Sequence, residues 1–508
     1  MLSQNLPKSR HRQNKLKEGM KKPSFFPINI MVFGTHRNVT SGSAMQIAIR
    51  YVWPAYLRDR LFGIICCLFA VCGLTGISSD VHAIEEYTAH GGPVKHLDLS
   101  PDGRLMVSAS FDYSAVMWRL PEFDEAATLI GHDAAVNIAR FSPDGRWLVT
   151  GGDDNQVLLW LVEDVLANPE DVEAVKLTAH KGKIVGLNFS SDSKFLISSS
   201  WDGTAMVWDM ARAAEGEASP VRLDGHEGPV NAAAFSEDGK FVYTAGYDGH
   251  IRYWRLSDKT FLRSIIRNGW GVNVMYVDET DGLIAYGTTD GAMVIHDLGT
   301  DTELVRMGDE RVPVLSVAIS PDKSQIGFGN AKGMVKIIDM ASMSLLRDFK
   351  AANGPIWSLL LMPQAGDMVV ASLDDHISKW QIQDFPPEIL DSPGPARRFH
   401  PTAEISNGER QFARKCSVCH TLEADGRRRA GPTLFGVFGR RAGSLPDYPY
   451  SQALLDSDII WSAESVARLF TDGPDVVTPG TKMPIQRMKN KQDRDDLIAY
   501  LLEVTQEN

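Results

Sequence analysis

The chain has 508 residues, of which 44% are hydrophobic, so it is long enough to bury more than one core. Its formal net charge is −12, and the residues after position 83 are more acidic still, with 41 Lys or Arg against 61 Asp or Glu. Such a balance argues against non-specific binding to nucleic acid or to an anionic membrane surface, although a local basic patch could still bind an acidic partner.

The N-terminal segment has the pattern of an export signal. An apolar run from Leu61 to Ser79 follows Arg58 and Arg60 and ends before a Val-His-Ala sequence that resembles a cleavage site after Ala83. We therefore predict that residues 1–83 are an export signal and that the mature protein is periplasmic. Because the run is longer than an average signal core, an uncleaved membrane anchor stays open as an alternative.

The start of translation is open too, because residues 1–44 show no apolar periodicity and a signal that began at residue 1 would be unusually long. Translation from Met45 would give an ordinary basic leader, so residues 1–44 would then not be translated. Three of the five cysteines, Cys66, Cys67 and Cys72, lie inside the apolar run. Cleavage after Ala83 would leave only Cys416 and Cys419.

The middle of the chain is built from repeats. Four clear ones each contain a His, an alternating strand, a polar turn, a second strand, an Asp turn and a strand that ends in Trp. The four strand tryptophans are Trp118, Trp160, Trp208 and Trp254, and three weaker repeats end near His296, Ile338 and Trp380. The pattern resembles the WD-repeat propeller family, whose blades are four-stranded sheets. This resemblance implies an all-β propeller of seven blades over residues 84–383.

The resemblance also implies roles for the repeated polar residues. In the family the loop His, the turn Asp and the strand Trp share a buried hydrogen-bond network, and the matching residues here are His90, His132, His180 and His226 with Asp112, Asp154, Asp202 and Asp248. These histidines are therefore poor candidates for metal binding or catalysis. We expect Ile84 to Thr88 to supply the outer strand of the seventh blade, which would close the ring.

After the repeats, residues 384–402 are rich in proline and poor in apolar periodicity, so they are predicted to be a semi-rigid linker. The motif CSVCH follows, with Cys416, Cys419 and His420. Two thiols at this spacing can each add to a vinyl group of one porphyrin, and the adjacent His lies beneath the iron as an axial ligand. A zinc site would need two more ligands, and none lie nearby. The motif therefore predicts one covalently bound haem c.

From Ile405 the chain resembles class I cytochrome c, and the stretches that carry the resemblance are NGERQFARKCSVCH, GPTLFGVFGRRAG, YPYSQAL, IIW, PGTKMP and DRDDLIAYLLE. The resemblance implies a small all-α domain over residues 403–508, with Met483 as the second axial ligand of the iron. It implies that the Pro432 carbonyl accepts a hydrogen bond from the His420 imidazole.

Further residues are assigned by the same resemblance. Arg440, Tyr450 and Trp461 fall where the family contacts the haem propionates, and Gly408, Phe412 and Tyr500 fall where its first and last helices meet. Two positions depart from the family pattern. Ile485 stands where an aromatic residue is common, and Pro484 directly follows the methionine, so the exposure of the haem edge and its potential could differ.

Together these features predict an exported c-type cytochrome whose His/Met-ligated haem transfers single electrons to or from redox partner proteins, with the propeller as a docking platform. We expect an electron carrier rather than a catalyst, without catalytic residues. An alternative is a periplasmic oxidoreductase whose propeller holds a second catalytic cofactor. The remaining histidines, which we expect to be surface or packing residues, are His96, His250, His296, His376 and His400.

Two further hypotheses concern the partners. A redox sensor, in which the haem state changes what the propeller binds, ranks last because no residue pattern marks a two-state element. Five arginines in the haem region, Arg427, Arg428, Arg429, Arg440 and Arg441, could steer an acidic redox partner to the haem edge.

Overall fold

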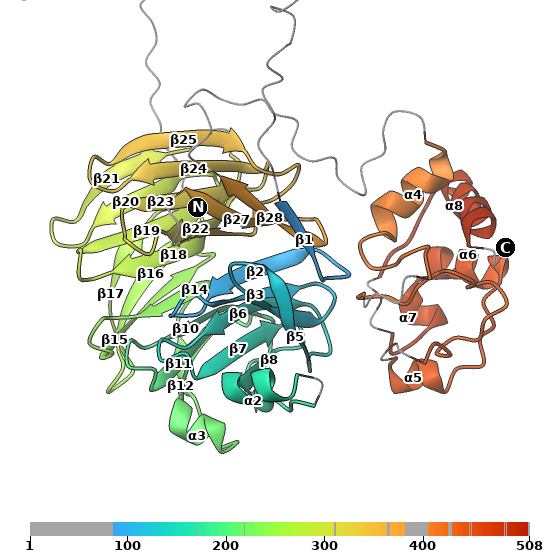
Figure 1. Ribbon diagram of the computed structural model, residues 1–508, viewed down its shortest axis with the longest axis horizontal. Coiled ribbons are helices and arrows are strands. Elements are labelled where there is room, and N and C mark those ends of the chain that lie inside the picture. The colour runs from blue at the N-terminus through green and yellow to red at the C-terminus, as the bar shows by residue number, and fades with distance from the viewer. Residues whose placement is uncertain are drawn as a thin grey trace, which may run out of the picture. The chain divides into compact units, whose positions relative to one another are not determined.

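The computed structural model describes residues 85–381 and 405–505, apart from residues 170, 218, 309–310, 363–365, 425–428, 447, 449, 482 and 484. The predicted export signal and the predicted linker lie outside the described residues. The first range is built almost entirely of strands and the second of helices and loops (Figure 1). Within these two ranges, no helix is long and apolar enough to cross a membrane.

Residues 85–381 form seven four-stranded antiparallel sheets, as the repeats predict. The first four sheets contain β2 (Val94–Leu99), β3 (Leu105–Ser110), β4 (Ser114–Arg119) and β5 (Asp124–Ile130); β6 (Val136–Phe141), β7 (Trp147–Gly152), β8 (Gln156–Leu161) and β9 (Val175–Thr178); β10 (Ile184–Phe189), β11 (Phe195–Ser200), β12 (Thr204–Asp209) and β13 (Val221–Asp224); and β14 (Val230–Phe235), β15 (Phe241–Gly246), β16 (His250–Arg255) and β17 (Thr260–Arg267). Two short helices, α2 (Val162–Ala167) and α3 (Met210–Ala214), follow β8 and β12.

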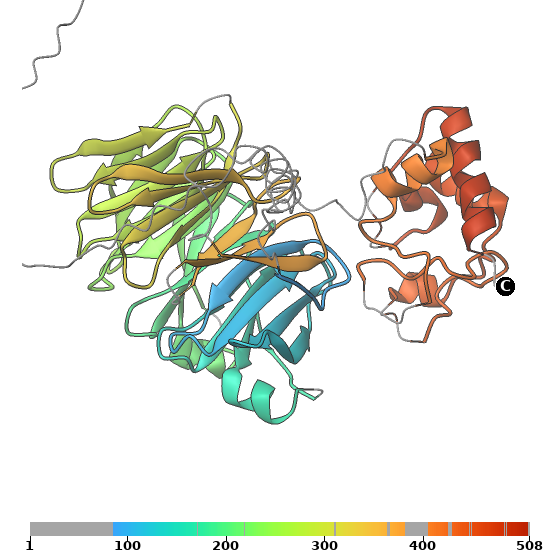
Figure 2. The same ribbon diagram turned by 45° about the horizontal axis from the view of Figure 1, so that its top comes forward.

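The other three sheets contain β18 (Val272–Asp278), β19 (Leu283–Thr288), β20 (Met293–Asp297) and β21 (Thr302–Met307); β22 (Val314–Ile319), β23 (Gln325–Asn330), β24 (Met334–Asp339) and β25 (Ser344–Lys350); and β26 (Ser358–Leu361), β27 (Asp367–Ala371), β28 (His376–Gln381) and β1 (Glu85–Thr88). The first strand of each sheet contacts the first strands of both neighbouring sheets, in the order β2, β6, β10, β14, β18, β22, β26 and back to β2. The sheets therefore stand around a ring, which Figure 2 shows from a second direction.

The ring closes through the first strand of the chain. Strand β1 pairs antiparallel with β28, with Glu85 opposite Lys379 and Thr88 opposite His376. The Tyr87 ring stacks on Phe123 in the first blade, with 4.3 Å between ring centroids. The prediction that this segment completes the seventh blade is confirmed for residues 85–88, while Ile84 lies outside the described residues.

A hydrogen-bond network repeats in the first four blades, as predicted. In the third blade, His180 Nδ1 lies 2.9 Å from Asp202 Oδ2, and His180 Nε2 lies 2.8 Å from Ser198 Oγ. Trp208 Nε1 donates to the same hydroxyl oxygen at 2.9 Å. The networks in the other three blades contain His90, Ser108, Asp112 and Trp118; His132, Thr150, Asp154 and Trp160; and His226, Thr244, Asp248 and Trp254. Each network satisfies buried polar atoms, so these histidines are structural.

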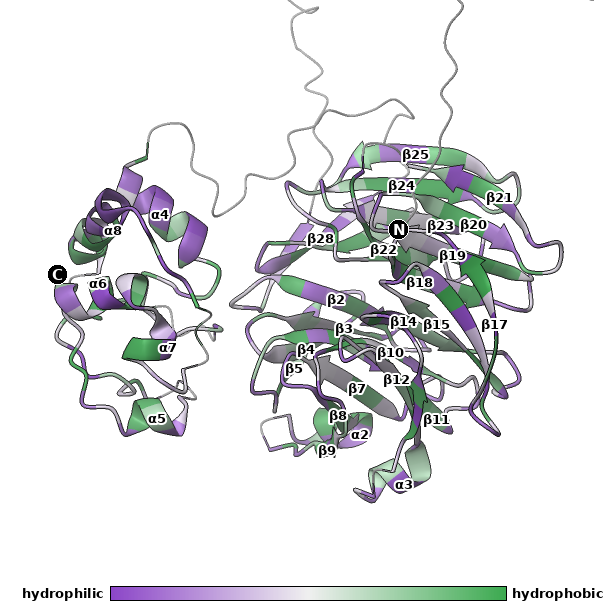
Figure 3. Cartoon of the chain, turned by 180° about the vertical axis from the view of Figure 1, so that it is seen from behind, coloured by the Kyte–Doolittle hydropathy of each residue, from purple (hydrophilic) through white to green (hydrophobic). Residues whose placement is uncertain are grey.

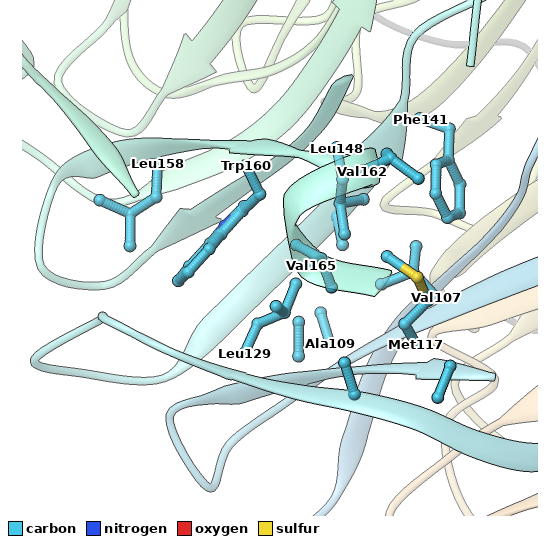
Figure 4. Packing of buried hydrophobic residues seen from close by; sticks show 14 of the residues in the cluster. Val107, Ala109, Met117, Leu129, Phe141, Leu148, Leu158, Trp160, Val162 and Val165 are labelled. Atoms are coloured by element: carbon cyan, nitrogen blue, oxygen red, sulfur yellow. The ribbon is translucent and has the colours of Figure 1, made fainter. Parts of the chain in front are cut away.

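Apolar residues fill the space between adjacent sheets. Figure 4 shows the cluster between the first and second blades, where Val107 and Met117 from one sheet face Leu148 and Trp160 from the other. Val165 from α2 packs into the same cluster and is fully buried. Burying one side chain of this size stabilises the fold by about 1.5–3 kcal/mol. The outer strands β17 and β25 carry both hydrophobic and hydrophilic residues (Figure 3), because one face of each outer strand meets solvent.

The weaker repeats form blades of the same kind, and two of them have His296 and Ile338 at the Trp position, whereas the third keeps Trp380. His296 is 5% exposed, and its Nε2 lies 3.0 Å from Asp301 Oδ1. Ile338 is fully buried, and Trp380 packs against Phe349 with 5.7 Å between ring centroids. The position of the strand Trp therefore accepts other side chains, as long as they fill the space between this blade and its neighbour.

Residues 405–505 form a separate helical core. The helices are α4 (Asn407–Lys415), α5 (Gln452–Leu455), α6 (Ala463–Thr471), α7 (Pro474–Val477) and α8 (Lys491–Val504). Helices α4 and α8 cross at Gly408, where a Cβ atom would lie 2.2 Å from the carbonyl oxygen of Asp496. Phe412 and Tyr500 pack next to this crossing, with 6.0 Å between ring centroids. The predicted contact between the terminal helices is therefore present.

Candidate haem site

Helix α4 places the CSVCH motif at its C-terminal end. The helix begins after Ser406, whose hydroxyl oxygen accepts a hydrogen bond from the Glu409 amide, and it ends at Cys416. The chain then turns tightly, because the amides of Cys419 and His420 both donate to the Cys416 carbonyl, at 3.0 and 2.8 Å. Both thiols and the imidazole line one cavity of the helical region as a result.

Neither Cys416 nor Cys419 takes part in a disulfide bond. Cys416 is 4% exposed, and burial raises the pKa of its thiol to about 12. Burial also raises the pKa of the Cys419 thiol. Among the described residues, no group of three or more His, Cys, Asp and Glu side chains gathers as a metal site. The pair therefore lacks the further ligands that a structural zinc site needs.

The imidazole of His420 is oriented by a hydrogen bond to the backbone of Pro432. Its Nδ1 lies 2.7 Å from the Pro432 carbonyl oxygen, so Nδ1 carries the proton and Nε2 is left with a lone pair. Burial lowers the pKa of His420, which favours this neutral form. A neutral imidazole with one nitrogen fixed in this way is the form that binds a metal.

Gly431 is a site residue that the sequence did not single out. A Cβ atom at this position would lie 2.4 Å from His420 Cε1, so only glycine allows the imidazole to pack here. The Gly431 amide donates to the Cys419 carbonyl at 2.8 Å, which fixes the two segments together. The sequence signal for this role is the Gly-Pro pair at residues 431–432, in which the glycine directly precedes the proline whose carbonyl binds His420.

Met483 lies in the lining of the same cavity, on a segment without regular secondary structure. Its amide donates to the Thr481 hydroxyl at 3.1 Å, and the Thr481 amide donates to the Thr478 carbonyl at 3.0 Å. Thr478 is anchored in turn, because its hydroxyl donates to the Pro474 carbonyl of α7 at 2.9 Å. This run of bonds fixes the backbone that carries the thioether.

Three polar or aromatic residues predicted as propionate contacts also line this cavity. Arg440 donates from Nη1 to the Phe435 carbonyl at 2.8 Å and from Nη2 to the Thr433 carbonyl at 2.6 Å. The Trp461 amide donates to the Arg440 carbonyl at 2.9 Å, so these two residues hold each other. Tyr450 lies nearby in the lining, and burial raises the pKa of its hydroxyl.

Tyr448 is a second residue that the sequence did not single out. Its ring packs edge-on against Tyr450, with 4.7 Å between ring centroids, and its hydroxyl donates to the Ala430 carbonyl. The bond ties the loop with Tyr450 to the loop with Pro432. Its sequence signal is the pair of tyrosines in YPYSQAL, of which only the second matched a family position.

Much of the remaining lining is apolar and comes from Leu434, Val437, Leu454, Val466, Leu469, Phe470 and Leu501, while Lys415, Ser451, Thr478, Thr481 and Gln486 add polar groups. The residues present thus fit a haem: two thiols and an imidazole on one wall, a thioether on another, apolar surfaces for the porphyrin, and polar groups for charged substituents. The structure brings every predicted site residue to this one cavity, namely Cys416, Cys419, His420, Pro432, Arg440, Tyr450, Trp461 and Met483.

Comparison with known proteins agrees with this geometry. Residues 405–505 match the family profile described as Cytochrome c, and residues 82–119, 123–160, 172–209 and 219–255 match the profile described as WD domain, G-beta repeat. The cytochrome c of Theileria annulata is 42% identical over 105 residues, which are 21% of this chain and 90% of that protein. The cytochrome c of Sesamum indicum is 40% identical over 105 residues, which are 21% of this chain and 94% of that protein.

The chain belongs to the cytochrome c family through its C-terminal region, and its haem-type site transfers electrons. The WD-repeat matches cover the first four blades, whose sequences are the clearest. The blades without a match are those in which other residues replace the strand Trp or the His–Asp pair, although they keep the four-stranded form.

Proposed function

We propose that the protein is an exported electron carrier that binds one haem covalently through Cys416 and Cys419, with His420 and Met483 as the two axial ligands of the iron. The observation that carries this proposal is that all four side chains line a single, largely apolar cavity. A haem with a His/Met pair supplies one-electron oxidation and reduction at a raised potential and has no open position for a substrate.

The chain's own residues have distinct tasks in this function. The Pro432 carbonyl orients the His420 ring, and the hydrogen bond strengthens the imidazole as a ligand. Arg440 keeps three of its five N–H donors after its two backbone bonds, so it can hold a propionate while it braces the loop. The apolar lining excludes water, which limits the reorganisation that accompanies a change of iron charge.

The propeller is proposed to act as a docking platform for redox partner proteins, in the periplasm after export by residues 1–83. Support for docking over a second catalytic site comes from the scattered histidines. His296 pairs with Asp301, and His376 lies 3.6 Å from Asp375 and from Glu86. His400 lies outside the described residues. Among the described residues of the propeller, no group of three or more His, Cys, Asp and Glu side chains has an arrangement that could hold a metal ion.

An arginine-based docking contact is a finer part of the proposal. Arg427 and Arg428 lie outside the described residues. Arg440 faces the cavity, whereas Arg441 is exposed and lies 3.8 Å from Asp458. Replacement of Arg427, Arg428 and Arg429 by Ser should slow electron transfer with an acidic partner at low salt. An unchanged rate would remove this contact from the proposal.

The test of the main proposal is spectroscopic. The protein is exported in a host with cytochrome c maturation, and reduced-minus-oxidised spectra, pyridine haemochrome spectra and iron per chain are recorded. One low-spin c-type haem per chain, lost from the Cys416→Ser/Cys419→Ser variant after denaturation, is the expected result. A second chromophore or a high-spin iron would favour the oxidoreductase with a propeller-bound cofactor. No covalent haem would refute the proposal.

A further inference from the structure

Three aromatic side chains of the propeller are unusually exposed. Trp201 is 51% exposed in the turn between β11 and β12, Tyr247 is 60% exposed in the turn between β15 and β16, and Trp270 is 57% exposed in the loop between β17 and β18. Large aromatic rings are costly to leave in water, and an exposed group of them marks a binding surface. We call Trp201, Tyr247 and Trp270 the aromatic platform.

The three residues belong to one continuous surface. A Cβ atom at Gly203, two residues after Trp201, would lie 3.3 Å from the Gly228 carbonyl oxygen. A Cβ atom at Gly228 would lie 4.0 Å from Tyr247 Cβ, and one at Gly249 would lie 2.9 Å from the Trp270 carbonyl oxygen. The loops of the third, fourth and fifth blades therefore touch in sequence, and the aromatic platform runs across them.

The fold does not require aromatic residues at these turns. The amides of Trp201 and Tyr247 donate to Lys183 and Pro229 carbonyls of the preceding loops, and the same backbone bond is made by Asp153, Thr289 and Ala331 in other blades. Aspartate, threonine and alanine occupy the equivalent turn position in those blades. In the first blade Phe111 makes the same bond to the Pro93 carbonyl, but its ring is half-buried and lies 5.4 Å from the ring of Trp357 between centroids. The exposed rings are a feature of this sector of the propeller rather than of the blade architecture.

The electrostatic surroundings favour a cationic partner. Residues 85–381 contain 25 Lys or Arg and 43 Asp or Glu, a net charge of −18. One cation of the chain already uses the platform, because Lys183 Nζ lies 3.6 Å from the ring centroid of Trp201. In the described part of the chain, Tyr247 and Trp270 carry no such cation on their faces.

Local charges on the platform are mixed. Exposed Glu227 lies beside Gly228 in the middle, while exposed Lys181 and Arg267 lie toward the two ends. A polyanion such as a nucleic acid also stacks on aromatic rings, but a propeller with a net charge of −18 repels it. A short basic segment, by contrast, is attracted by the negative net charge of the propeller. It can also place its cationic side chains on the ring faces of Tyr247 and Trp270.

We propose that the aromatic platform binds a basic, arginine- or lysine-containing segment of a partner protein, with cationic side chains seated on Tyr247 and Trp270. This proposal rests on the docking role given to the propeller above and names the surface and the kind of partner. Each exposed cation–π contact contributes about 0.5–1 kcal/mol. The acidic propeller increases the rate of association more than the final affinity.

The experiment uses the full-length haem-loaded protein and fluorescein-labelled dodecapeptides of alternating residues: arginine and glycine, citrulline and glycine, and glutamate and glycine. The arginine peptide should bind, and the neutral citrulline peptide should bind at least tenfold more weakly. The Tyr247→Ala/Trp270→Ala variant should bind the arginine peptide about tenfold more weakly, which corresponds to two contacts. Phe261→Ala is the matched control, since Phe261 is 44% exposed on the outer strand β17.

Restoration of binding by Tyr247→Phe/Trp270→Phe would separate a role of the ring faces from a loss of local structure. Equal affinity of the double alanine variant and the Phe261→Ala control, stronger binding of the glutamate peptide or of an oligothymidylate, or no binding at all would overturn the proposal. Reduction of the haem by ascorbate is followed in the same samples. Failure of peptide binding with normal haem reduction refutes the platform and leaves the electron-carrier proposal intact.

Discussion

Met483 is the least constrained of the four proposed haem-binding residues, since it lies outside helices and strands and is fixed by hydrogen bonds through Thr481 and Thr478. We expect Met483→Ala to keep the covalently attached haem but to lower its midpoint potential by on the order of 0.1 V, because a thioether ligand favours the reduced iron. The variant should also bind added imidazole at the freed position. Potentiometric titration and difference spectra with imidazole measure both effects.

Met488 provides the control for this substitution. It is 5% exposed, packs in the core of the same region, and is absent from the cavity lining. Met488→Leu conserves side-chain volume and should leave the potential unchanged. A Met483→Ala protein with the potential of the unsubstituted protein would show that another residue completes the coordination.

The residues that the sequence revealed are those whose spacing alone defines their chemistry. Cys416, Cys419 and His420 form a contiguous motif, and Met483 lies within a recognisable stretch. Gly431 and Tyr448 were missed because their roles depend on contacts between segments: one makes room for the His420 ring, and the other bonds to Ala430. No pattern of neighbouring residues encodes such contacts.

At the scale of elements, the crossing of α4 and α8 depends on one glycine. We expect Gly408→Ala to destabilise the helical region by about 3 kcal/mol, because the new methyl group would lie 2.2 Å from the Asp496 carbonyl oxygen and force the helices apart. Alanine would otherwise stabilise a helix relative to glycine by about 0.5–1 kcal/mol, so the sign of the effect is informative. Urea unfolding followed by haem absorbance measures it.

The exposed Arg414 in the last turn of α4 supplies the matched control. Arg414→Ala should change stability by no more than about 0.5 kcal/mol. A Gly408→Ala protein at least as stable as the unsubstituted one would mean that the helices do not cross as closely as described.

The buried histidines of the blades predict a loss of stability in acid. The pKa values of His180 and His226 are lowered by burial, against the opposing hydrogen bonds to Asp202 and Asp248. The unfolded chain therefore binds more protons than the folded one as pH falls below 6.5, the ordinary pKa of these groups. The free energy of unfolding should fall by up to about 1.4 kcal/mol per histidine for each pH unit below that value. Urea unfolding at pH 7 and pH 5 measures the difference.

The pKa of His376 shifts in the opposite direction, so a variant that lacks His180 and His226 is needed to isolate their contribution to the acid sensitivity. Burial alone would lower its pKa, but a hydrogen bond to Asp375 and the charge of Glu86 raise it, so its stabilising contribution is present below pH 6.5 and fades as pH rises. The His180→Gln/His226→Gln protein should therefore lose less stability between pH 7 and pH 5 than the unsubstituted protein. An equal loss in both proteins would assign the acid sensitivity to other groups.

Element positions were well predicted where the repeats were regular. Trp118 and Trp160 are 42 residues apart, but the next two intervals are 48 and 46. The extra residues form α2 after β8 and α3 after β12. The longer intervals give only the number of extra residues. The strand periodicity does not indicate that they are helical, because apolar residues such as Val165 pack on the adjacent sheets through contacts that only the fold creates.

At the scale of the whole molecule, the propeller depends on closure by its first strand. Removal of Glu85–Thr88 should destabilise it by about 3 kcal/mol, through the lost pairing with β28 and the lost stacking of Tyr87 on Phe123. The exposed edge of β28 should also promote self-association. Thermal unfolding and light scattering detect the two effects. Glu85→Ala is the control, because it keeps the strand and loses only the exposed pair with Lys379 and the exposed hydrogen bond from the Tyr87 hydroxyl. A monomeric deletion protein with unchanged stability would mean that the ring does not need this strand.

Charge is distributed unevenly along the molecule, and this predicts how salt affects electron transfer. Residues 405–505 carry 14 Lys or Arg and 13 Asp or Glu, a net charge of +1, whereas residues 85–381 carry −18. At about 0.01 M salt the screening length is about 30 Å, so the propeller charge acts on dissolved reagents over a longer range than at 0.1 M salt, where this length is only about 10 Å. The ratio of the oxidation rate by a cationic cobalt complex to that by ferricyanide should therefore rise several-fold on dilution from 0.1 M to 0.01 M salt.

The ratio of the two oxidation rates could instead fall as the salt concentration is lowered. Such a result would also be informative, because five arginines are concentrated in the haem region. If ferricyanide gains on the cationic complex as salt is lowered, the local arginines outweigh the propeller at the site of electron transfer. Replacement of Arg427, Arg428 and Arg429 by Ser should then reverse the trend. If the trend already favours the cationic complex, the same replacement should only strengthen it, since three positive charges would be removed from a region, residues 84–508, that already holds 41 Lys or Arg against 61 Asp or Glu.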